Sequence, residues 1–92
     1  MNYISLDKNE LYMSVGERFN DYSNEYLDSL VYIQDYEKDH VFEVYFDNFK
    51  DAKKYFFQIL ETIESYNIIN VLCNEYFSMF GKYPQIESYD SI

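Results

Sequence analysis

The segment from Leu30 to Phe46 reads LVYIQDYEKDHVFEVYF and carries the clearest fold signal in the chain. Its two ends, residues 30–33 and 41–46, are apolar and rich in β-branched and aromatic side chains, which favour strands. The polar residues 35–40 lie between them, and two such runs with a short polar connection are typical of a β-hairpin. Because a lone hairpin is marginal in water, this one must pack on a helix, gain a third strand or pair with another chain.

The residues before the hairpin predict an amphipathic N-terminal helical region. Apolar residues recur there at intervals of three and four, as on one face of a helix, at Leu11, Val15, Phe19, Tyr22, Tyr26 and Leu30. Gly16 weakens such a helix by about 1 kcal/mol relative to alanine, so the pattern is also compatible with two shorter helices. The alternative fold is an all-α bundle, in which the first helix continues through Ile33.

The residues after the hairpin predict two further helices. Asp47 or Asn48 can cap the first, whose apolar face consists of Phe49, Ala52, Phe56, Ile59, Leu60, Ile63 and Tyr66. The second has Ile69, Leu72, Cys73, Tyr76 and Phe80 on one face and stops at Gly81, with Pro84 beyond. The predicted fold is therefore α+β, with an N-terminal helical region, a hairpin and two C-terminal helices in one domain over residues 1–84. Residues 85–92 are expected to form a polar, frayed tail.

The charge of the chain is strongly acidic. Its 92 residues contain 17 acids and 7 bases, for a formal net charge of −10. The stretch from Glu17 to Asp47 contains nine acids and only two bases, Arg18 and Lys38, so it alone carries a net charge of −7. Such a field repels nucleic acid and anionic membranes and attracts basic surfaces. The partner is therefore expected to be a basic protein, although the charge could also serve only to keep an aromatic-rich domain soluble.

Catalytic and metal-site signals are weak. The single cysteine, Cys73, rules out a disulfide or a multi-cysteine zinc site within the chain, and with no leader-like or membrane-spanning run we expect a cytoplasmic protein. The single histidine, His40, has no evident catalytic partner. The spacing of Asp35, Glu37 and Asp39 is similar to the first three ligands of a calcium loop, but His40 and Phe46 stand where that loop needs Gly and Glu. We expect no enzymatic activity, cofactor or metal.

The acidic side chains are the best binding candidates. On a helix, the four-residue steps from Glu17 to Asp21 to Glu25 would place carboxylates about 6 Å apart along the axis, a spacing of the same order as that of DNA phosphates. Tyrosines lie between further acids and offer rings where a basic partner would otherwise stack bases. Each observation also has a non-functional explanation. The acidic row can face water or pair with Lys50, Lys53 and Lys54, and the high tyrosine content can result from codon bias. The predicted partner-binding residues are Glu17, Asp21, Glu25, Asp28, Asp35, Tyr36, Glu37, Asp39, Glu43 and Tyr45.

In size and charge, the chain resembles the small acidic inhibitors made by phages and mobile elements, including anti-CRISPR proteins and other DNA mimics. This resemblance implies a non-enzymatic inhibitor that blocks the cationic nucleic-acid site of a nuclease or defence effector. The chain also resembles bacterial immunity proteins, which implies an immunity or antitoxin partner of a basic toxin. A third hypothesis is an oligomeric accessory or structural domain, such as a homodimer closed through its strands and aromatic surface.

Overall fold

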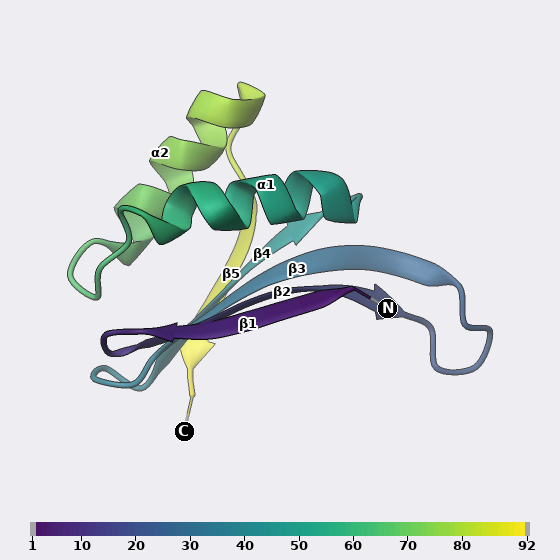
Figure 1. The fold of residues 1–92 in the computed structure, drawn as a ribbon, viewed down its shortest axis with the longest axis horizontal. Helices are drawn as coiled ribbons and strands as arrows, with labels where there is room; N and C mark the ends of the chain where they lie inside the picture. Colours follow the sequence, from purple (N-terminus) through teal and green to yellow (C-terminus); the bar gives the residue numbers. More distant parts are fainter. Residues whose placement is uncertain (1, 92) are drawn as a thin grey trace.

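The computed structural model describes residues 2–91 and shows a five-stranded antiparallel sheet with two helices on one face (Figure 1). The strands lie side by side in chain order, as β1 (Tyr3–Lys8), β2 (Leu11–Phe19), β3 (Tyr26–Asp35), β4 (His40–Phe46) and β5 (Gln85–Asp90). Helices α1 (Phe49–Leu60) and α2 (Ile68–Phe80) connect β4 to β5. Neither described helix is long and apolar enough to cross a membrane.

The prediction of an N-terminal helical region was wrong. The predicted order of elements and the all-α alternative were therefore wrong as well. Residues 3–8 and 11–19 form β1 and β2 instead. Alternation within residues 11–16 explains this, because Leu11, Met13 and Val15 are buried beneath the helices while the residues between them point to the other face. The helical pattern of apolar residues at intervals of three and four did not include Met13.

Residues 85–90, assigned by the sequence to a polar tail, form β5, which pairs antiparallel with β4. Ile86 lies opposite Val44 in this pairing and packs against the core. Most other side chains of β5 are exposed, so the strand adds backbone pairing but little apolar pattern. The last residue of the expected tail, Ile92, lies outside the described residues.

The hairpin segments pair in the structure, with Val31 opposite Val44 and Ile33 opposite Phe42. The turn between β3 and β4 has Asp35 at its start and Asp39 at its end and contains no Asn-Gly pair. The Asp35 Oδ1 atom accepts hydrogen bonds from the backbone N–H groups of Glu37 at 3.0 Å and Lys38 at 3.3 Å. Asp39 takes the left-handed conformation, with φ 51°, that returns the chain to β4.

The core lies between the sheet and the helices. Helix α1 starts at the Asn48 cap, whose side chain accepts the Asp51 N–H at 2.8 Å, and packs across β2, β3 and β4. Helix α2 packs against α1, where the buried Tyr55 hydroxyl donates to the Leu72 carbonyl at 2.7 Å, and α2 ends at Gly81 in the left-handed region. The fully buried large side chains of this core are Tyr55, Phe56, Leu11, Met13, Ile33, Ile59, Ile63, Leu72, Val15, Val31 and Val44. Val41 is also buried but points to the other face of the sheet, between Gln34 and Tyr89 in the register.

Candidate binding surface on the open face of the sheet

The second face of the sheet is left open, because both helices lie on the same side (Figure 1). Strand alternation directs every second side chain to this open face, and the register sets aromatic and acidic residues beside one another across it. We define the open face by the following residues: Tyr3, Tyr12, Ser14, Asp28, Leu30, Tyr32, Gln34, Tyr36, Glu43, Tyr45, Glu87 and Tyr89, with Arg18. It is therefore a tyrosine-rich surface that carries carboxylates.

A shallow hollow of about 380 Å³ lies at the β1 to β3 side of this face. Tyr3 and Tyr12 form part of its lining, and their hydroxyl oxygens are 2.6 Å apart. The Tyr3 ring lies directly over Gly16, where an added Cβ would approach the Tyr3 Cδ2 atom to 2.7 Å. Gly16 thus has a role different from the helix weakening suggested by the sequence, since the absence of a Cβ allows the Tyr3 ring to approach β2 closely.

Two glutamates oppose each other at the β4 to β5 side. Glu43 and Glu87 are direct partners in the strand register, an arrangement that destabilises a sheet when both carry charge. The Tyr45 hydroxyl donates to Glu87 Oε2 at 3.3 Å, which relieves only part of the repulsion. Within the described strands, Arg18 is the one lysine or arginine on this face. It is already paired with Asp28, with both nitrogen to oxygen distances 2.6 Å, while its guanidinium lies 5.1 Å from the Tyr45 ring centre.

Burial and the nearby carboxylates together raise the pKa of three tyrosines on the open face. Burial, followed by the adjacent Glu43 carboxylate, raises the pKa of Tyr89 to about 12. The same two causes, in the same order, raise the pKa of Tyr32 and of Tyr45. These hydroxyl groups are protonated at neutral pH, as an ordinary tyrosine is, and can donate hydrogen bonds to a carboxylate.

The free energy of unfolding is expected to be steady from neutral pH to about 10 and to fall as the pH rises towards about 12. The unfolded chain releases its tyrosine protons near pH 10, whereas the folded protein holds them, so alkaline pH favours unfolding. The pKa of buried Tyr55 is raised further still, chiefly by burial, and acts in the same direction. Urea unfolding at a series of pH values would measure the effect. A Glu43→Gln variant should show a lower pKa for Tyr89, and an unchanged tyrosine titration in that variant would contradict the assignment.

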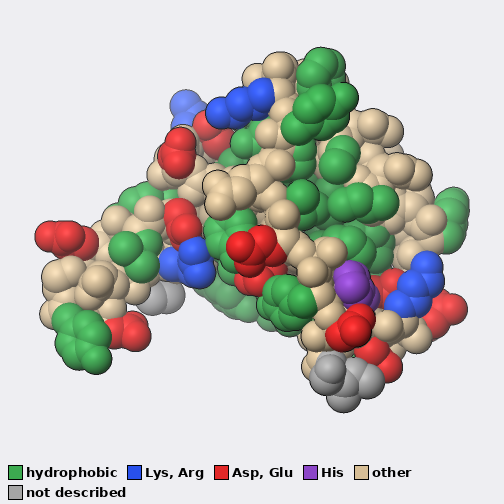
Figure 2. All heavy atoms as spheres, turned by 180° about the vertical axis from the view of Figure 1, so that it is seen from behind, with side chains coloured by type: hydrophobic (Ala, Val, Ile, Leu, Met, Phe, Trp, Pro, Cys, Tyr) green, Lys and Arg blue, Asp and Glu red, His purple; other side chains and the backbone are tan. Residues whose placement is uncertain are grey.

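The structure disperses the acidic row predicted on a helix. Glu17 lies on β2 and accepts hydrogen bonds from the backbone and side chain of Asn2, both at 2.8 Å. Asp21 and Glu25 lie in the loop between β2 and β3, which projects from the body of the molecule (Figure 1). Glu37 and Asp39 lie in the β3 to β4 turn, at the other end of β3. Figure 2 accordingly shows carboxylates in separate groups, with no continuous row on this side of the molecule.

Four of the predicted residues lie on the open face, namely Asp28, Tyr36, Glu43 and Tyr45, with Asp28 and Tyr36 at opposite ends of β3. Asp35 does not, because it is buried on the helix side with 1% of its surface exposed. Sequence reasoning missed the remaining tyrosines and Glu87. The alternation around Tyr12 could have revealed part of this set, whereas Glu87 and Tyr89 lie in a segment with no apolar strand pattern.

Other reactive groups do not form a second constellation. The His40 Nδ1 atom lies 3.1 Å from Asp90 Oδ1, and Cys73 is a half-buried free thiol on α2. Residues 2–91 contain no group of three or more His, Cys, Asp or Glu side chains placed to hold a metal ion. Comparisons with protein-family models, curated proteins and solved structures find no match to this chain.

Proposed function

We propose that the chain is a non-enzymatic acidic binding protein that uses the open face to block a cationic nucleic-acid-binding surface of another protein. The observation that carries the proposal is the opposed pair Glu43 and Glu87, set among tyrosines on an uncovered sheet face. An arginine inserted between these carboxylates would neutralise their repulsion and donate hydrogen bonds to both, while the Tyr45 hydroxyl keeps its own hydrogen bond to Glu87.

The chemistry of the open face favours arginine-rich protein over nucleic acid itself. Aromatic side chains on an open antiparallel sheet can stack bases, and RNA-binding domains use such surfaces. Here the face adds the carboxylates of Asp28, Glu43 and Glu87 and only one arginine, and the whole chain carries −10. That field would repel a phosphate backbone, while guanidinium groups gain both carboxylate partners and tyrosine rings.

Self-association through this face is disfavoured by the same charges, because a second copy would bring identical carboxylates together. An immunity role against a basic toxin uses the same surface chemistry as inhibition of a nuclease or defence effector. The two therefore differ in the identity of the basic partner.

Affinity capture from a bacterial lysate tests the proposal, with the wild-type protein and a Glu43→Gln, Glu87→Gln variant as parallel baits at low and high salt. A basic nucleic-acid enzyme held by the wild-type bait, and lost both at high salt and with the variant, is the expected result, since exposed charge contacts are screened within about 10 Å at 0.1 M salt. Recovery of a small basic toxin would favour the immunity role. Equal recovery by both baits, or recovery of further copies of the chain alone, would overturn the proposed use of the open face.

A further inference from the structure

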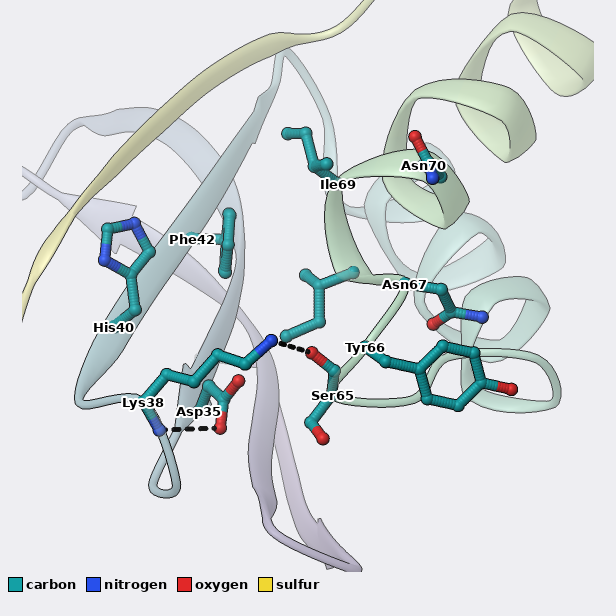
Figure 3. Close-up of a pocket in the computed structure, with 10 residues that line it drawn as sticks. Asp35, Lys38, His40, Phe42, Ser65, Tyr66, Asn67, Ile69 and Asn70 are labelled. Atoms are coloured by element: carbon teal, nitrogen blue, oxygen red, sulfur yellow. Dashed lines mark hydrogen bonds between the residues drawn. The ribbon is translucent and has the colours of Figure 1, made fainter.

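A separate pocket of about 270 Å³ lies on the helix side, between the β3 to β4 turn and the start of α2 (Figure 3). Its lining includes Asp35 and Lys38 from the hairpin, His40 and Phe42 from β4, and Ser65 and Ile69 from the α1 to α2 connection and α2. The space is small for a drug-sized ligand but suits a single side chain or a compact molecule.

The floor of the pocket contains a buried carboxylate oxygen that lacks a partner. Asp35 is only 1% exposed, and its Oδ1 atom is occupied by the two backbone N–H groups of the turn. Its Oδ2 atom is buried and accepts no hydrogen bond from any described residue. Figure 3 shows the two oxygens diverging, one towards the Lys38 amide and the other towards the pocket. Buried acceptors are nearly always paired, so this atom points to a missing donor.

The nearby lysine does not supply that donor. The Lys38 side chain passes over Asp35 and donates from Nζ to the Ser65 carbonyl at 3.1 Å (Figure 3). Asp35 takes part in no ion pair among the described residues. Asp35 Oδ2 and the Ser65 carbonyl are therefore two acceptors on the two sides of the same pocket, with one exposed lysine chain between them.

The walls of the pocket suit an organic cation. His40 and Phe42 pack edge to face, with ring centres 5.0 Å apart, and Ile69 lies across from Phe42 (Figure 3). Hydrophobic side chains continue from His40 over the back of the molecule (Figure 2). Two further acids face the same region, since Asp90 of β5 contacts His40 and Glu37 of the turn contacts the Ser65 hydroxyl. Aromatic walls with surrounding carboxylates favour a delocalised positive charge.

We propose that this pocket binds a guanidinium or primary ammonium group, which donates to Asp35 Oδ2 and to the Ser65 carbonyl in place of Lys38 Nζ. The inference does not depend on the open face, which lies on the other side of the sheet. The same chemistry is offered by two sources, a small free amine or guanidine and an arginine or lysine side chain of a protein.

Amide NMR titration with methylguanidinium tests the site, with the neutral N-methylurea, which has a similar shape, as the matched control. We expect saturable shifts confined to Glu37, Lys38 and residues 65–70, with methylurea producing none. Acetyl-Gly-Arg-Gly-amide distinguishes the sources. Tighter binding of this peptide than of methylguanidinium would indicate a protein side chain, and weaker binding a free small molecule.

Two variants change the affinity in opposite directions. Asp35→Asn keeps the oxygen that caps the turn but replaces the free acceptor with a donor, and should weaken binding at least about tenfold. Lys38→Met removes the competing ammonium from an exposed position and should strengthen binding. A Glu43→Gln, Glu87→Gln variant should bind as the wild type does, which separates this site from the open face. Equal shifts with methylurea, or no saturable shift in both wild-type and Lys38→Met proteins, would overturn the proposal.

Discussion

Replacing Phe56 with alanine is expected to lower the free energy of unfolding by about 3–5 kcal/mol, because the ring is fully buried and its loss leaves a cavity. Small domains are stable by only about 5–15 kcal/mol in total, so this single change would bring the protein close to unfolding. The adjacent Phe57 provides a matched control on the same helix. It is 45% exposed, and Phe57→Ala is expected to cost less than about 1 kcal/mol.

Urea denaturation of both variants, followed by circular dichroism, measures the difference. The comparison is sharp because the two rings are chemically identical neighbours, packed edge to face with centres 5.5 Å apart. Similar losses for Phe56→Ala and Phe57→Ala would mean that α1 is rotated from the described orientation on the sheet. A large loss for Phe57→Ala alone would mean that its ring is covered in solution.

The two helices could be anticipated because their signals are local. The side chain of Asn48 caps α1 and Gly81 takes the left-handed conformation after α2, as such residues do at helix ends. Most of the apolar residues expected on the inner helix faces are buried, including Phe56, Ile59 and Leu72, whereas Tyr66 and Ile69 are exposed. No distant part of the chain is needed to interpret these patterns.

The strands at the two ends of the chain depend on partners that are remote in sequence. Residues 85–90 contain one apolar side chain that packs against the core, Ile86, and form a strand because β4 presents an unpaired edge. In β2, the alternation of Leu11, Met13 and Val15 competed with a longer apolar pattern of helical period. Pairing with β1 and β3 on both sides decides the outcome in favour of a strand.

The same misplacement explains why the candidate site was only partly predicted. A helix would have aligned Glu17, Asp21 and Glu25, whereas the hairpin from β2 to β3 sends the last two into its loop. Glu43 and Tyr45 were both named as binding candidates and lie on the same side of β4, but their neighbour Glu87 belongs to a strand that the sequence alone did not indicate. The composition predicted an acidic and tyrosine-rich surface, and the sheet determines which of those residues face the same way.

Reversing Glu43 and Glu87 to lysine together is expected to weaken binding to the basic partner recovered by capture at least about 100-fold, because two close charge pairs become repulsions. Asp21→Lys with Glu25→Lys provides the matched control, since it changes the net charge by the same amount in an exposed loop. The control should lose only the long-range part of the attraction. This loss is measured as a slower association than that of the wild type at low salt, and the difference between the two proteins should disappear at high salt.

Surface-bound kinetics at two salt concentrations distinguish the outcomes. A loss that appears mainly in the dissociation rate of the Glu43→Lys, Glu87→Lys protein places those carboxylates in the contact itself. The reversed pair still opposes like charges across β4 and β5 and also loses the hydrogen bond from the Tyr45 hydroxyl to Glu87, so thermal unfolding checks that the variant remains folded. Equal losses for both double variants would mean that net charge alone attracts the partner and that the open face has no special part in binding.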